Sequence, residues 1–227
     1  MAKKKQDFAK QDERLEEVNE TLTGAGKWIE DNANLLTWII AGIIVVVMAV
    51  IAINQYVIKP KALEASNENA KAAAYFLAGD FDKALNGDEA ECIGFAAIAD
   101  EYSHYQQGKL AALYAGICHY EKGEFDEAAK YLKKFDAKDL NIAPATRQLL
   151  GDAYVELGEY GKAINAFEAA AQSGNDIIAP MSLKKAGIVY LHEGKNAKAK
   201  KAFEAIKADY PSSAEAQDID KYIAIAQ

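Results

Sequence analysis

The chain has 227 residues, 51% of them hydrophobic, and contains only 4 Pro and 15 Gly. This composition excludes a disordered, collagen-like or disulfide-dense protein. The net charge is −8, so the basic footprint of a nucleic-acid-binding protein is absent and we expect no nucleic-acid partner. Two cysteines are too few for a disulfide framework.

Residues 1–34 form a polar tail, for which the pattern predicts a short amphipathic helix. Phe8, Leu15, Val18 and Leu22 fall on one stripe, and acidic residues fill the other sides. An isolated helix of this length is marginally stable in water. Two interpretations therefore stay open for the tail, a solvated and frayed segment or a contact site for a membrane partner.

The sequence predicts a transmembrane helix over residues 35–58. Leu35–Ile53 contains 19 mostly aliphatic residues without a charge, which as a helix span about 28 Å, close to the hydrocarbon core of a bilayer. Trp38 and Tyr56 lie near its two ends, where aromatic rings favour the interface. A buried core element would rarely run so long, and a cleaved signal peptide would begin earlier. We expect a retained single-pass anchor.

Charge does not decide which side of the membrane the tail occupies. Residues 1–31 carry six Lys and Arg, but close to the span only Lys27 precedes it, whereas Lys59, Lys61 and Lys71 follow. The positive-inside rule is therefore indecisive.

Residues 59–227 contain an internal repeat. Two series of glycines recur at steps of 35 and then 36 residues: Gly116, Gly151 and Gly187, and Gly123, Gly158 and Gly194. An alanine and a large apolar residue follow each second glycine: Ala128 and Leu132, Ala163 and Phe167, and Ala199 and Phe203. This pattern resembles the tetratricopeptide repeat, a helix–turn–helix unit of 34 residues. The resemblance implies an all-α fold in which residues 59–227 form an α-solenoid.

Each repeated residue type has a physical role in such a pair of helices. The first glycine lets the first helix approach its partner closely, and the second lies where the chain must turn back. The alanine permits close packing on the second helix. The large residue fills the space between repeats.

A degenerate copy precedes the three regular ones. Tyr75 and Gly79 match the end of a first helix, and Phe95, Ile98 and Tyr102 repeat a later spacing. This copy carries about seven extra residues around positions 86–89. The array is therefore expected to hold about four helical pairs.

The C-terminus is expected to cap the array. Ser212 and Glu215 form a capping-box pattern, which predicts the start of a last helix. Its apolar stripe would consist of Ile219, Tyr222, Ile223 and Ala226. Such a helix would cover the open apolar face of the last pair.

We find no motif for catalysis, a metal or a cofactor, and predict that the chain is not an enzyme. His119 occupies an aromatic packing position of the repeat, and Cys118 aligns with a small buried one. Two buried free thiols are favoured for Cys92 and Cys118, with a disulfide as the alternative in an oxidising compartment.

The candidate binding surface is the concave side, which first helices line in tetratricopeptide arrays. Leu113, Ile117 and Tyr120 fall at i, i+4 and i+7 and share one helical face. We expect this face to be free unless a neighbouring helix covers it. The candidate binding residues are Leu113, Ile117, Tyr120, Val155, Lys184, Ile188 and Leu191. The Lys/Asn clamp of arrays that bind peptide C-termini is absent, so the mixed apolar surface favours extended or unfolded segments.

The order of tail, anchor and repeats resembles the YfgM-like family, whose members are ancillary subunits of the SecYEG translocon. The stretches 94–102, 114–116 and 221–223 are especially similar to its Bacteroidetes-type members. The resemblance implies a cytoplasmic N-terminus, a periplasmic repeat domain in the bacterial inner membrane, and association with SecYEG and a PpiD-like periplasmic chaperone.

Two functions follow from this organisation. The first is a translocon-associated scaffold or holdase that receives emerging polypeptides. The alternative is a general cell-envelope assembly scaffold that binds one folded partner and has no role in secretion.

Overall fold

The computed structural model describes residues 26–88, 91–137 and 139–227. The chain divides into two compact units, Met1–Lys59 and Pro60–Gln227. The amphipathic helix predicted for the tail falls mostly on residues 1–25, which lie outside the described residues, while residues 26–31 are helical.

The first unit is dominated by helix α2 (Ala33–Ile53), none of whose residues is buried. In the described part of the chain, one helical stretch, Ala33–Leu77, is long and apolar enough to cross a membrane by length and composition alone. A π-helical turn, Asn54–Ile58, follows α2 and ends two residues before Pro60. Because proline lacks an amide hydrogen and its ring crowds the preceding turn, a widened turn suits this position.

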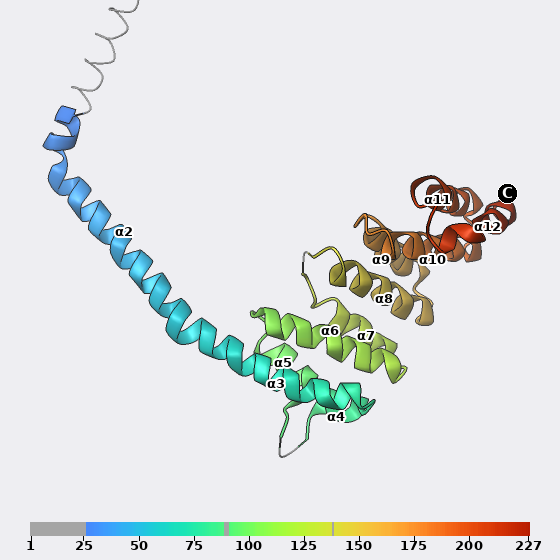
Figure 1. Cartoon of the computed structure of the whole chain (residues 1–227), viewed down its shortest axis with the longest axis horizontal. Coiled ribbons are helices and arrows are strands. Elements are labelled where there is room, and N and C mark those ends of the chain that lie inside the picture. The colour runs from blue at the N-terminus through green and yellow to red at the C-terminus, as the bar shows by residue number, and fades with distance from the viewer. Residues whose placement is uncertain (1–25, 89–90, 138) are drawn as a thin grey trace, which may run out of the picture. The chain divides into compact units, whose positions relative to one another are not determined.

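The second unit is a row of helix pairs (Figure 1). Its helices are α3 (Lys59–Leu77), α4 (Phe81–Asn86), α5 (Gly94–Glu101), α6 (Gln106–Glu121), α7 (Phe125–Leu132), α8 (Ile142–Glu156), α9 (Tyr160–Ala171), α10 (Ile178–His192), α11 (Asn196–Asp209) and α12 (Ile219–Ile225). The pairs α6/α7, α8/α9 and α10/α11 follow one another in chain order (Figure 1). Among the described residues there is no β-strand, so the all-α prediction is confirmed for them.

The repeated glycines have the roles that the sequence predicted. Gly123, Gly158 and Gly194 adopt φ values of +77°, +70° and +67° where the first helix of each pair ends. L-residues with a side chain rarely adopt this left-handed region, so glycine suits the turn.

The other glycine series lies against a large side chain of the second helix. A Cβ atom built on Gly151 or Gly187 would overlap the ring of Phe167 or Phe203, and one on Gly116 would overlap Leu132. The missing side chain therefore makes room for the residue that fills each pair. The alanines at positions 128, 163 and 199 are fully buried, as expected.

The first pair differs because its second helix is broken. Helix α4 ends at Asn86 and α5 begins at Gly94, and the described residues between them, 87–88 and 91–93, lie outside helices. The Asp88 carboxylate joins the two sides of this connection, since it accepts hydrogen bonds from the backbone N–H groups of Glu91 and Cys92 and from the Tyr75 hydroxyl. The seven extra residues predicted near positions 86–89 fall in this connection, of which residues 89–90 lie outside the described residues.

The buried apolar side chains form two clusters that occupy separate stretches of sequence. The N-terminal cluster contains buried residues from Ala65 to Cys118, including Phe95 and Ile98. The C-terminal cluster contains buried residues from Ala129 to Ala226. The second unit is therefore stabilised by two groups of side chains rather than by one continuous group.

The C-terminal helix begins later than the sequence predicted. The capping box at Ser212 does not open a helix, because residues 211–214 form a turn and Glu215–Gln217 a single 3₁₀ turn. Ser213 rather than Ser212 supplies the capping oxygen, which accepts a hydrogen bond from the Ala216 N–H at 3.2 Å. Helix α12 then starts at Ile219, and its predicted apolar stripe packs into the C-terminal cluster as expected.

Candidate binding face

The first helix of each regular pair has a packed side, which its glycine marks, and a side turned away from it. Successive residues of a helix are rotated by about 100°. The position after the glycine therefore points about 100° from the packed side, whereas positions three before and four after it point only about 60° and 40° away. Ile117, Asp152 and Ile188 occupy the position after the glycine, and all three are partly or fully accessible. We call the accessible side of α6, α8 and α10 the open face.

Three predicted binding residues illustrate this rotation. Ile188 is 44% exposed, and Ile117 is half-buried. Leu113 lies three positions before Gly116 and is only 8% exposed. Its side chain is turned towards the interior of the array and is not available on the open face.

The predicted residues that lie four positions after a glycine are also drawn inward. Tyr120, Val155 and Leu191 are half-buried and pack against the C-terminal cluster. Neighbouring helices thus cover part of the face that the i, i+4, i+7 pattern describes, which is the alternative that the sequence left open.

Lys184, the remaining predicted residue, contacts the C-terminal cap. Its Nζ atom lies 2.6 Å from Asp218 Oδ1 and 4.8 Å from the centre of the Tyr222 ring. The next residue, Lys185, pairs with Asp152 of the preceding repeat at 2.6 Å. These lysines link α10 to its neighbours on both sides.

The structure also brings together apolar side chains that sequence reasoning missed. Leu140, Ile142, Ile177 and Met181 are 71%, 47%, 71% and 36% exposed at the starts of α8 and α10. The Asn175 side chain joins the two starts by donating a hydrogen bond to the Leu140 carbonyl at 3.0 Å. We call these four side chains the apolar edge. The sequence signal for the two helix starts was the Ile-Ala-Pro triplet that recurs at 142–144 and 178–180, of which Ile142 belongs to the apolar edge.

The apolar edge continues into the open face. Ile142 lies nine positions before Gly151 and Met181 six before Gly187, so they point about 180° and 120° from the packed side. Helices α8 and α10 contact each other. Ile142, Met181 and Ile188 are therefore accessible apolar side chains on the outward sides of two contacting helices.

The two cysteines lie in surroundings that favour a structural role over a chemical one. Cys92 and Cys118 are buried and unbridged, and burial raises the pKa of the Cys118 thiol to about 12. Such a thiol stays protonated and is a poor nucleophile at neutral pH. In the described part of the chain, no group of three His, Cys, Asp or Glu residues is placed to hold a metal ion.

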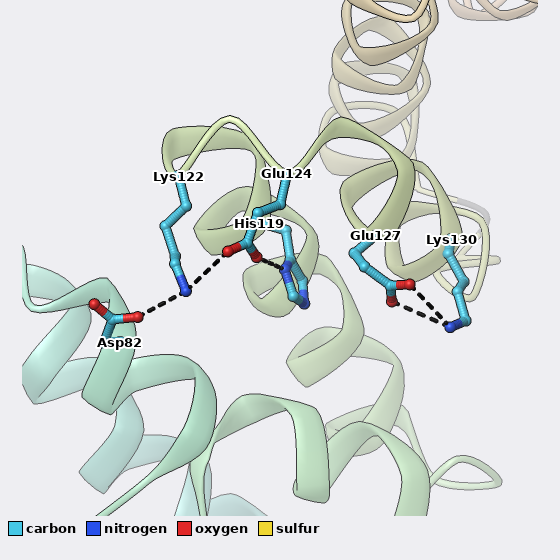
Figure 2. A network of polar contacts seen from close by, with 6 residues as sticks. All are labelled: Asp82, His119, Lys122, Glu124, Glu127 and Lys130. Atoms are coloured by element: carbon cyan, nitrogen blue, oxygen red, sulfur yellow. Dashed lines mark hydrogen bonds and ion pairs between the residues drawn. The ribbon is translucent and has the colours of Figure 1, made fainter.

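His119 packs against an aromatic ring as predicted, and it also joins a polar network. The imidazole stacks on Tyr131 with ring centres 5.2 Å apart, and its Nδ1 lies 2.6 Å from Glu124 Oε2. Figure 2 shows Lys122 between Glu124 and Asp82, at 3.2 and 2.7 Å from their carboxylate oxygens. The network ties the turn of the second pair to α4 of the first.

The succession of helix pairs, with glycines at the turns and at the close contacts, defines a tetratricopeptide-type helical repeat protein. Solved structures of this fold are similar to the chain. Two crystal structures of MamA share 21% and 20% identity with TM-scores of 0.50 and 0.53, and cover 68% and 71% of this chain and 91% and 89% of their own. The kinesin light chain repeats of Podosopora anserina share 12% identity with a TM-score of 0.55, and cover 73% of this chain and 86% of their own.

The sequence also matches a family model over residues 46–220. That family is described as "T7SS, ESX-1 secretion system protein EccA1, N-terminal domain", and the chain belongs to it. No curated protein sequence matches the chain.

Proposed function

We propose that the chain is a membrane-anchored repeat scaffold that holds polypeptide segments on its open face and apolar edge. The observation that carries the proposal is the exposure of the apolar side chains Ile142, Met181 and Ile188 on two contacting helices. Apolar side chains gathered in this way on a repeat array offer contact area to an extended or unfolded segment. No covalent chemistry and no cofactor are required for this role, and we propose that the chain is not an enzyme.

The proposed anchor is residues 35–58, between an N-terminal tail (1–34) and the repeat domain (59–227). All residues of α2 are accessible, so the helix has no protein partner within the described residues that covers its apolar side chains. A lipid bilayer would cover them. We propose a cytoplasmic tail and a periplasmic repeat domain at the bacterial inner membrane, on the strength of the YfgM-like resemblance.

The proposed setting is a protein-export machinery. Two observations support it, namely the YfgM-like resemblance of nearly the whole chain and membership of a family described after a secretion-system protein. The partners proposed on this basis are the SecYEG translocon, a PpiD-like chaperone and polypeptides that emerge from the translocon.

A general envelope scaffold that binds one folded partner is the second candidate. The charged part of the open face favours it, because Asp152 and Lys185 form an ion pair across two repeats. A folded partner with complementary charges would fit such a surface better than an unfolded segment.

Aggregation assays separate the two candidates. We expect the full-length protein in lipid nanodiscs to suppress aggregation of a chemically unfolded polypeptide. Replacing Met181 and Ile188 with Ser should weaken this effect by about 1–2 kcal/mol of binding free energy per side chain. The matched control is Ile225→Ser, which removes an apolar side chain of similar exposure on α12. Equal suppression by the double variant would exclude the open face as the site, and no suppression by the natural protein would favour the second candidate.

Topology is tested separately with protease added outside intact spheroplasts. Digestion of the repeat domain with protection of the tail is the expected result. Digestion only after lysis would contradict the proposed orientation, and release of a shorter soluble form would contradict the retained anchor.

A further inference from the structure

A cavity of about 340 Å³ lies where the second helices of the last two pairs meet α10. Helix α9 contributes Glu168 and helix α10 contributes Leu183 and Tyr190, while α11 contributes Lys198, Lys201 and two alanines. None of these side chains belongs to the open face or the apolar edge. The cavity combines ammonium groups with aliphatic and aromatic surface.

The preceding repeat contains the same arrangement and serves as an internal reference. Lys162 lies over the Tyr154 ring with Nζ 5.4 Å from its centre, and Lys198 lies over the Tyr190 ring at 5.5 Å. The two lysines occupy equivalent positions, four residues after Gly158 and Gly194 respectively.

The two lysines differ in whether their charge is balanced. Lys162 is paired with Glu159 at 2.8 Å, at the start of its helix. The position equivalent to Glu159 in the last pair is Lys195, so the carboxylate is replaced by a second ammonium group. Among the described residues, Lys198 has no carboxylate within ion-pair distance.

The cavity gains further positive charge from α11. Lys201 stands where the preceding repeat has Asn165, and it too has no ion-pair partner in the part of the chain described. The one carboxylate of the cavity, Glu168, accepts a hydrogen bond from the Tyr190 hydroxyl at 2.6 Å.

The charge distribution of the repeat domain sets this region apart. Residues 183–207 carry seven Lys against two acidic residues, whereas residues 60–182 carry 11 basic residues against 20 acidic ones. Five of the seven lysines are in ion pairs, and among the described residues Lys198 and Lys201 of the cavity are the two without one. A local basic region on an acidic domain attracts acidic ligands selectively and steers their approach.

We infer that the cavity formed by Glu168, Leu183, Tyr190, Lys198, Lys201 and Ala205 binds an acidic segment of a protein partner. A carboxylate of that segment meets Lys198 and Lys201, and an aliphatic side chain beside it contacts Leu183 and Ala205. An extended chain enters a recess of this size, whereas a flat bilayer contacts protruding lysines and is repelled by the acidic remainder of the domain. The inference goes beyond the proposed function, because this site is separate from the open face.

The test uses the full-length protein in detergent micelles and a short fluorescein-labelled peptide of alternating leucine and glutamate. Fluorescence anisotropy should show binding that weakens as NaCl is raised. The variant Lys198→Gln/Lys201→Gln should weaken binding by at least about tenfold, since each lysine supplies a charge-assisted contact. Retention of affinity by this variant would overturn the inference.

Two further variants make the test specific. Lys195→Glu gives Lys198 the carboxylate partner that Glu159 supplies to Lys162 in the preceding repeat. We expect this variant to weaken peptide binding, although it changes no residue that lines the cavity. Lys162→Gln, the matched control, should leave the affinity unchanged. An equal loss of peptide affinity in Lys162→Gln and in the cavity variant would indicate a general charge effect and contradict a specific site in the cavity.

Two other probes separate the possible ligands. The same peptide with glutamine in place of glutamate should not bind. Stronger binding to phosphatidylglycerol vesicles than to the peptide, lost in the cavity variant, would assign the site to lipid and overturn the inference. All four lysine substitutions should leave aggregation suppression through the open face unchanged. A failure of peptide binding in the cavity is therefore distinguishable from a failure of the proposed function.

Discussion

The first pair and the last two pairs satisfy the same packing requirement by different means. In the last two pairs, Gly151 and Gly187 leave room for the rings of Phe167 and Phe203. In the first pair the equivalent small residue is Ala72, seven positions before the turn glycine, and it is fully buried. A Cβ is thus tolerated in one region and excluded from the other.

Aromatic contacts pack the first pair and join it to α6 of the second. Within the first pair Phe76 meets Phe81 edge-on at 5.6 Å, and Tyr114 of α6 stacks on Phe95 with ring centres 5.0 Å apart and meets Phe76 at 5.2 Å. Such aromatic pairs stabilise beyond their buried area. Close packing of the last two pairs therefore depends on the absence of a Cβ atom at Gly151 and Gly187. Packing of the first pair depends instead on several aromatic rings and on the hydrogen bonds of Asp88.

The largest expected effect comes from removing the C-terminal cap. Truncation after Pro211 deletes the fully buried Ile219 and the half-buried Tyr222 and Ile223 from the C-terminal cluster. Their burial contributes about 4–6 kcal/mol in total, so we expect a lower melting temperature or aggregation. Hydrogen exchange should increase in α9–α11 and leave α3–α6 protected. An unchanged melting curve, or equal exchange in both regions, would contradict the separation of the clusters.

Adding a methyl group at Gly187 should give the next largest effect. Alanine favours a helix interior by up to about 1 kcal/mol over glycine, yet its Cβ here would overlap the Phe203 ring. We expect a net loss of about 1–3 kcal/mol in the free energy of unfolding, measured by circular dichroism in denaturant.

The control for Gly187→Ala combines it with Phe203→Ala, which removes the ring atoms that the added methyl group would overlap. The loss in the double variant should be smaller than the sum of the two single losses, because the overlap exists only when both the methyl group and the ring are present. The reverse change in the first pair, Ala72→Gly, should destabilise by about 1 kcal/mol through helix propensity. A stabilising effect of Ala72→Gly would show that the Cβ atom of Ala72 is sterically crowded in the first pair as well.

Tyr75→Phe should have a smaller and local effect. The hydroxyl donates a hydrogen bond to the Asp88 carboxylate, which also accepts hydrogen bonds from the backbone N–H groups of Glu91 and Cys92. Loss of this contact should reduce the free energy of unfolding by about 1 kcal/mol. Hydrogen exchange should rise at Glu91 and Cys92 and stay unchanged in α8–α11. An equal increase of hydrogen exchange in both regions would show that the contact of Tyr75 with Asp88 also stabilises the later pairs.

The smallest expected effect concerns Glu124. The hydrogen bond from His119, and then Lys122, holds the pKa of this carboxyl below its usual range. A lowered folded-state pKa adds stability above the ordinary glutamate pKa of about 4.3, and this stability is lost as the pH falls through the lower value.

Thermal melts between about pH 6 and pH 3 measure the contribution of Glu124. The decline of the melting temperature with acid should be shallower in Glu124→Gln than in the natural protein. Glu127→Gln, which removes the exposed pair with Lys130 at 3.1 Å, is the control and should leave the slope unchanged. A steeper decline in Glu124→Gln would show that the network does not favour the ionised carboxyl.

The sequence was sufficient for features that depend on spacing along one helix pair. Gly158 and Phe167 were placed correctly because a turn and a close contact constrain residue type directly. The extra loop was predictable because the distance from Gly79 to Phe95 exceeds the regular spacing by seven residues.

The sequence was insufficient where the outcome depends on the angle between neighbouring helices. Leu113 and Ile117 share a helical face, yet one is buried and the other half-buried, because Leu113 points about 60° from the packed side of α6 and Ile117 about 100°. The Ser212 capping box failed for a related reason, since packing of Ile219 into the cluster decides where the last helix begins.

The separation of the two clusters along the chain has a consequence for biogenesis. Every buried member of the N-terminal cluster lies at or before Cys118, whereas the C-terminal cluster requires residues up to Ala226. A growing chain that has reached the end of α6 already contains all the buried side chains of its first cluster. Folding during synthesis can therefore proceed from the N-terminal end while the last pairs are still being made.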